Sequence, residues 1–176
     1  MLLYKDIISG DELFSDAYPM TKKGDLLYEV DCALINIGVG DIDIGANASA
    51  EGGDEQVEDS VETKINLVHS MRLAETSFDK KSYMSYIKGY MKKILAHLEE
   101  ESKEGKNPEA AAERLQIFKA KAPETIKEIV KNFKDYEFYV GEGMDPDGMV
   151  ALLNYREDGV TPYFSFFMDG LKEEKL

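Results

Sequence analysis

The chain has 176 residues, enough to bury a hydrophobic core of its own and few enough for a single domain. Its 35 acidic residues outnumber 21 basic ones, and a net charge of −14 argues against nucleic acid or an anionic membrane as the main partner. Cys32 is the only cysteine, and neither a signal peptide nor an apolar run of membrane-spanning length is evident, so we expect a cytoplasmic protein without an internal disulfide.

The N-terminal part of the chain is predicted to form strands. Residues 1–8 have strand character, and residues 26–35 read as further strands. Between them, Ser9 followed by Glu12 three positions later is the pattern of a capping box, which predicts that a short helix or turn begins there.

Residues 38–63 change character. They contain eight acidic residues and no Lys or Arg, with Gly, Ala and Ser filling much of the rest. Such a segment cannot bury enough apolar surface to offset its ordering entropy, so we expect a long mobile acidic loop. Residues 65–73 then return to alternating apolar and polar positions, which predicts another strand.

A helical hairpin is predicted over residues 79–133. Asp79 is a suitable N-cap, and apolar residues recur at three- and four-residue steps after it. Asn107 and Pro108 then provide a cap and a first position for a second helix. Pro123 interrupts the second apolar stripe and is expected to kink or split that helix. The first stripe consists of Tyr83, Ile87, Tyr90, Ile94 and Leu98.

Residues 134–170 are predicted to form a β-meander. The sequence Asp145-Pro146-Asp147-Gly148 matches a type I turn, and Asp158-Gly159 suits a hairpin reversal that needs positive φ. The whole chain, 1–176, is therefore predicted to be one α+β domain, with a mostly antiparallel sheet and an inserted helical hairpin. The strands of the meander are expected at 136–141, 149–155 and 163–168.

No catalytic signature is present. The sequence contains neither a phosphate-binding glycine fingerprint nor a nucleophile elbow. His69 and His97 are isolated and lack the spacing of zinc ligands, and Cys32 would need the fold to bring it to a histidine. The sequence predicts no enzyme and assigns no cofactor.

Calcium is the alternative ligand. The loop that starts at Asp145 resembles an EF-hand superficially, but Met149 and Arg156 stand where oxygen ligands are required. The carboxylates of residues 38–63 are expected to attract Ca²⁺ weakly, and a solvated linker without a specific site is the alternative interpretation. No metal ligands are assigned.

Two surface features have competing interpretations. Glu12 is either half of the capping box with Ser9 or an exposed acid presented to a partner. The lysines of the first predicted helix form a solvated face or contact an acidic partner such as tubulin. These lysines are Lys80, Lys81, Lys88, Lys92 and Lys93.

Three stretches resemble the translationally controlled tumour protein family. Residues 133–163, with Gly141-Glu-Gly-Met-Asp-Pro-Asp-Gly-Met-Val-Ala-Leu-Leu-Asn-Tyr-Arg, are similar to the family's C-terminal signature, and Ile44-Gly-Ala-Asn-Ala-Ser-Ala-Glu-Gly52 resembles its N-terminal one. Residues 1–16 are similar to the family's start, so the resemblance covers the whole chain. It implies a tent-like, twisted β-structure with a projecting helical hairpin and a flexible acidic loop.

The resemblance also implies a function. The family's fold is similar to that of a Rab-binding nucleotide-release chaperone. This similarity implies that the family regulates small GTPases of the Rheb type, with Glu12 as a contact residue. Glu142, Met144 and Asp147 are further candidates for that surface. The family is also associated with calcium, tubulin, translation elongation factors, anti-apoptotic proteins and growth control. Family members often end in Cys where this chain has Leu176, so we expect a monomer.

Overall fold

The computed structural model describes residues 1–38 and 61–176, which form an α+β fold whose strand pairs are all antiparallel. This confirms the predicted fold class. One sheet has the order β11 (Leu171–Lys175), β1 (Leu2–Asp6), β2 (Glu12–Ser15). The largest has the order β3 (Met20–Lys23), β4 (Leu27–Asp31), β10 (Pro162–Phe167), β9 (Ala151–Tyr155), β8 (Glu137–Val140), β7 (Ala74–Thr76). The third pairs β5 (Leu34–Gly38) with β6 (Val61–Ile65).

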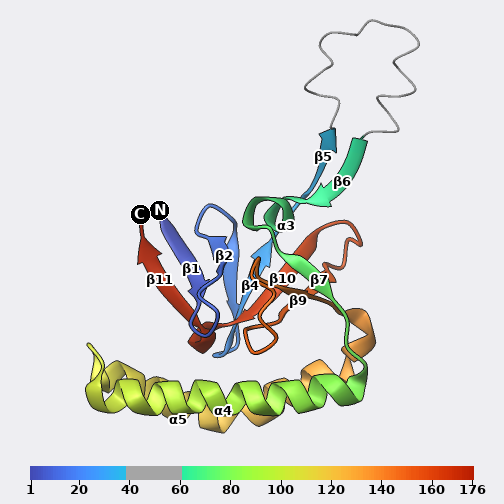
Figure 1. The fold of residues 1–176 in the computed structure, drawn as a ribbon. Helices are drawn as coiled ribbons and strands as arrows, with labels where there is room; N and C mark the ends of the chain where they lie inside the picture. The colour runs from blue at the N-terminus through green and yellow to red at the C-terminus, as the bar shows by residue number, and fades with distance from the viewer. Residues whose placement is uncertain (39–60) are drawn as a thin grey trace, which may run out of the picture.

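The two long helices lie against one end of these sheets. Figure 1 shows α4 (Lys80–Glu104) and α5 (Pro108–Lys131) side by side along the base of the β-structure, with the two termini together at its opposite end. The buried side chains of α4, among them Tyr83, Ile87 and Tyr90, belong to the same core as Phe164 and Phe166 of β10. The hairpin therefore closes the core that the sheets leave open.

The caps of the hairpin are as predicted. Asp79 accepts a hydrogen bond from the Ser82 amide at 2.7 Å, and the Asp79 amide donates to the Ser82 hydroxyl at 3.1 Å. Asn107 accepts from the Ala110 amide at 3.2 Å, and Pro108 stands at the first helical position. A kink or a split was expected at Pro123. The split does not occur, because α5 is continuous through this residue. Buried Phe118 and Ile129 on either side of the proline hold both halves of α5 against the core.

The predicted meander is present as β8, β9 and β10 in adjacent positions. Its first connection contains the type I turn, in which the Gly148 amide donates to the Asp145 carbonyl at 3.1 Å. In the second, Gly159 has φ of 72° and the Asp158 carboxylate accepts from the Val160 and Thr161 amides. Both turns were predictable because their residues act on their own neighbours.

Two local predictions are wrong. Residues 65–73 are not a strand: β6 ends at Ile65, and α3 (Asn66–Met71) follows, with Leu67 buried. The Ser9–Glu12 capping box does not form, because the Ser9 hydroxyl donates to the Asp6 carboxylate at 2.8 Å and Glu12 begins β2. A turn does occupy residues 7–9.

The predicted acidic loop, residues 38–63, extends too far at both ends. Gly38 pairs with Val61, Ile37 with Glu62 and Asn36 with Thr63, so the margins of residues 38–63 are strands. The rest of that prediction lies outside the described residues.

Candidate functional site

The connection between β8 and β9, residues 141–150, carries three of the four predicted site residues. Glu142, Met144 and Asp147 lie on it, and all three are largely or partly exposed. Glu12, the fourth, is exposed at the start of β2. Whether these residues are close together depends on how the connection is anchored to the β1–β2 segment.

Asp6 is the first anchor. Its side chain, in a residue only 3% exposed, lies at the end of β1. One carboxylate oxygen accepts from the Met149 amide at 2.7 Å and from the Ser9 hydroxyl at 2.8 Å, while the other accepts from the Ile8 amide at 2.9 Å. A single buried carboxylate thus ties the turn after β1 to the end of the 141–150 connection.

Asp11 is the second anchor. Its carboxylate accepts from the Gly143 amide at 3.1 Å. The backbone of Gly141 packs directly on the Asp11 side chain, and a Cβ placed on Gly141 would clash with it. Glycine is therefore required at Gly141 because the two segments approach so closely.

Tyr86 of α4 is the third anchor. Its hydroxyl donates to the Gly148 carbonyl at 2.6 Å and accepts from the Val150 amide at 3.0 Å. Burial raises the pKa of this phenol, so the hydroxyl stays neutral and can donate one hydrogen bond while it accepts the other. The 141–150 connection is thus held to β1, β2 and α4 at several points.

This anchoring brings Glu12 and Glu142 together. Both line a polar hollow of about 410 Å³, with Asp11 and Arg72 among the other residues of its wall. The Arg72 guanidinium lies 3.2 Å from a Glu142 carboxylate oxygen, and its side chain is 77% exposed. We call this hollow, defined by Asp11, Glu12, Arg72 and Glu142, the acidic hollow. It presents three carboxylates and one cation.

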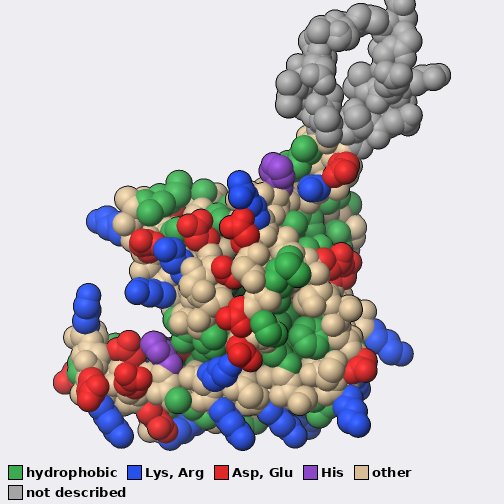
Figure 2. All heavy atoms as spheres, in the orientation of Figure 1, with side chains coloured by type: hydrophobic (Ala, Val, Ile, Leu, Met, Phe, Trp, Pro, Cys, Tyr) green, Lys and Arg blue, Asp and Glu red, His purple; other side chains and the backbone are tan. Residues whose placement is uncertain are grey.

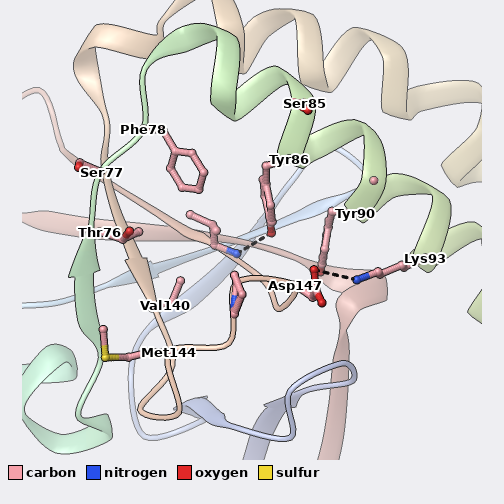
Figure 3. A pocket seen from close by; sticks show the side chains of 13 residues that line it. Thr76, Ser77, Phe78, Ser85, Tyr86, Tyr90, Lys93, Val140, Met144 and Asp147 are labelled. Carbon is pink, nitrogen blue, oxygen red and sulfur yellow. Dashed lines mark hydrogen bonds and ion pairs between the residues drawn. The ribbon is translucent and has the colours of Figure 1, made fainter.

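Met144 and Asp147 face a different cavity. They line a hollow of about 500 Å³ between α4 and the strands, with Phe78, Tyr86 and Val150 in its wall. Figure 3 shows Phe78 and Tyr86 pointing into this space and Met144 at its edge. It also shows Asp147 paired with Lys93, whose Nζ lies 3.3 Å from the Asp147 Oδ1. The structure therefore divides the four predicted residues between two hollows on either side of one connection.

The residues considered for other chemistry are placed differently. Burial raises the pKa of the Cys32 thiol to about 12, which disfavours a nucleophilic thiolate at neutral pH. His69 is exposed on α3, and His97 on α4 lies 3.8 Å from Glu101. Arg156 pairs with Glu29 and Asp31, each at 2.6 Å. In residues 1–38 and 61–176, no three His, Cys, Asp or Glu side chains group as metal ligands would.

Sequence reasoning missed Asp6, Asp11 and Arg72. Asp6 three residues before Ser9 is a local turn pattern, but nothing in the sequence points to its bond with Met149. Arg72 has φ of 56°, a left-handed conformation that ends α3 and is uncommon for a residue with a Cβ. Only the structure could show that this helix end faces Glu142.

No helix in the described part of the chain combines the length and apolarity needed to cross a bilayer.

Comparison with known proteins agrees with the fold. The family model for the translationally controlled tumour protein matches residues 1–172. Homologues named translationally-controlled tumor protein are 58% identical in Schizosaccharomyces pombe and 51% identical in Saccharomyces cerevisiae, with both chains fully covered in each case.

Two solved structures are also similar. A translationally controlled tumor-associated protein from Schizosaccharomyces pombe has a TM-score of 0.80 and 58% identity, with 100% of both chains covered. The translationally-controlled tumor protein of Caenorhabditis elegans has a TM-score of 0.68 and 30% identity, covering 100% of this chain and 99% of that one. The chain therefore belongs to the translationally controlled tumour protein family.

Proposed function

We propose that this protein is a non-catalytic binding protein that docks a small GTPase of the Rheb type through the acidic hollow. The observation that carries the proposal is the meeting of Glu12 and Glu142, both candidates for one surface by family resemblance, in the wall of one hollow. The identity of the partner rests on the family resemblance. The chemistry of the hollow suits a basic partner surface.

Glu12 is the carboxylate best placed to contact such a partner. Glu142 is paired with Arg72, whereas Glu12 forms no salt bridge with any residue that the structure describes. Its cross-strand neighbour is Lys5, whose ammonium lies 2.5 Å from Glu174. Because Glu12 forms no salt bridge with the described residues and the Lys5 ammonium is engaged by Glu174, the Glu12 carboxylate remains available to a partner's lysine or arginine, and it contributes mainly to the association rate and to specificity.

The first prediction concerns Glu12→Gln. Because Glu12 caps no helix and is exposed, we expect the free energy of unfolding to change by less than about 0.5 kcal/mol. We expect the Kd for the GTPase to rise by about tenfold, mainly through a lower association rate, because a partner cation loses its counter-charge. Calorimetry at two salt concentrations, with denaturant unfolding of the same samples, measures both quantities.

Glu75→Gln is the matched control, since Glu75 is also exposed on a strand but lies in β7, away from the hollow. It should leave both quantities unchanged. Equal affinities of wild type and Glu12→Gln, in folded protein, would show that the site assignment is wrong. Equal losses in both variants would instead reflect a general effect of net charge.

The wider roles remain proposals drawn from the family. They comprise association with translation elongation factors, tubulin and anti-apoptotic proteins, and through them growth control and cell survival in the cytoplasm. The absence of a catalytic role is likewise a proposal. It is supported by the raised pKa of the Cys32 thiol.

Calcium binding is the alternative function. The eight acidic residues between 38 and 63, without a Lys or Arg, favour it. We expect weak binding, with a Kd in the millimolar range typical of low-affinity carboxylate sites. A Ca²⁺ titration followed by amide chemical shifts tests this prediction, with Mg²⁺ as the control ion. The absence of localised shifts at millimolar Ca²⁺ would exclude it.

A further inference from the structure

The hollow on the other side of the 141–150 connection has the form of an anchor pocket. Its volume is about 500 Å³, and its wall is mainly apolar and aromatic. Tyr86, whose hydroxyl is bonded at Gly148 and Val150, is fixed in place and packs between Phe78 and Tyr90 at ring-centroid distances of 5.5 and 5.7 Å. The pocket is therefore formed before any ligand arrives. Figure 3 shows it open between α4 and the strands.

Gly89 lies in the wall between this pocket and a neighbouring hollow. It lies within α4, where glycine is less favourable than alanine. Beyond the adjoining backbone of α4 itself, a Cβ placed on Gly89 would meet no atom of the described residues within 4 Å, so packing against other parts of the chain gives no reason for glycine. Gly89 and Ser85 line both the anchor pocket and a second, open hollow on the outer face of α4. Small residues at this shared wall allow another backbone to cross the helix closely.

The second hollow is basic. Lysines line it, and Met84 is the apolar residue in its wall. No acidic residue occurs in α4 before Glu99, although the whole chain carries a net charge of −14. Figure 2 shows Lys and Arg side chains along the outer side of the helix layer. The lysines of this hollow are Lys80, Lys81, Lys88 and Lys92.

We propose that α4 and the 141–150 connection form a binding site for an acidic peptide segment that carries one aromatic or large aliphatic anchor residue. The anchor enters the pocket beside Phe78 and Tyr86, the backbone crosses α4 at Gly89, and flanking carboxylates lie over Lys88 and Lys92. This site lies beyond the proposed GTPase surface and is distinct from the acidic hollow, since it has the opposite charge and shares none of its lining residues.

The charge and shape of the site favour this ligand over others. Four lysines beside an apolar pocket complement acidic side chains around an apolar one. A nucleic acid would meet the same lysines but also the repulsion of the surrounding negative charge. A purely electrostatic contact of the lysines would need neither the pocket nor the glycine. The anchor residue is therefore the distinguishing part of the proposal.

The test uses the full chain and a fluorescent peptide of Asp and Glu residues with one central Phe. Its partner peptide has Ala in place of Phe. We expect the Phe peptide to bind with a Kd at least about tenfold lower than the Ala peptide, because the anchor supplies most of the binding energy. Equal binding of both peptides, or binding of neither, would overturn the proposal. So would capture by phosphatidylserine vesicles without binding of the Phe peptide.

Gly89→Ala gives an independent readout. It should raise the urea midpoint of unfolding, because alanine favours the helix and finds open space. It should also raise the Kd of the Phe peptide about tenfold, because the new methyl group occupies the crossing path. The control, Ala96→Gly at an exposed position of the same helix, should lower the urea midpoint and leave the Kd unchanged. An unchanged Kd in Gly89→Ala would refute the crossing at Gly89.

Discussion

Asp6→Ala is expected to lower the free energy of unfolding by about 3 kcal/mol. The substitution removes the acceptor of three hydrogen bonds at once, from Ile8, Ser9 and Met149. The Met149 amide is buried, so it would lose its partner without gaining water, and an unsatisfied buried donor costs more than the bond itself contributes. Urea unfolding followed by far-UV circular dichroism measures the loss.

Two further variants test whether the carboxylate is responsible. Ser9→Ala removes one of the three donors and also the acceptor of the Asp11 amide, and should cost about 1–2 kcal/mol, because the bonds of Asp6 to Ile8 and Met149 remain. Asp6→Asn should fall between Ser9→Ala and Asp6→Ala, since its amide oxygen still accepts but its amide nitrogen faces a donor. If Asp6→Ala were no less stable than Ser9→Ala, the bond to Met149 would contribute nothing to stability.

The features that were predictable from the sequence depend on nearby residues. Asp79 caps α4 through Ser82, and Asn107 caps α5 through Ala110, each three positions away. The turn at Asp145 likewise closes on Gly148. Side chains that act within the same turn leave a readable pattern, and the spacing of apolar residues reveals which face of a helix is buried.

The errors arose where another contact competed with the local pattern. Ser9 and Glu12 have the spacing of a capping box, but Ser9 is engaged by Asp6 and Glu12 pairs across the sheet with Lys5. Leu67 and His69 alternate as in a strand, yet burial of Leu67 is achieved by a short helix. In the first case a competing local hydrogen bond and strand pairing outweighed the capping-box pattern, and in the second the burial of Leu67 outweighed a weak strand preference.

The candidate site was predictable only in part, for the same reason. The family resemblance singled out Glu12 and Glu142 but could not say that they share a hollow. They do so because Asp11 binds Gly143, which is 132 residues away in the chain. A single sequence carries no signal for a contact of that range, so Asp6, Asp11 and Arg72 could be recognised only from the structure.

Gly141→Ala is the second substitution with a large expected effect, about 2–3 kcal/mol of lost stability. The new methyl group would overlap the base of the Asp11 side chain, which cannot rotate away from it, so the backbone must move. That movement would separate Asp11 from the Gly143 amide and Glu142 from Glu12. We therefore expect weaker GTPase binding as well as lower stability, measured by calorimetry and urea unfolding.

A double-mutant cycle identifies the clash as the cause. Asp11→Gly removes the side chain that the methyl group would strike, so the loss in the double variant should be smaller than the sum of the two single losses by at least about 1 kcal/mol. Gly143→Ala is the graded control: its Cβ would lie 3.1 Å from the tip of the Asp11 carboxylate, which can shift, so its cost should be below that of Gly141→Ala. Strict additivity of Gly141→Ala and Asp11→Gly would contradict the direct contact, and Glu12 and Glu142 would then have to be held together by other means.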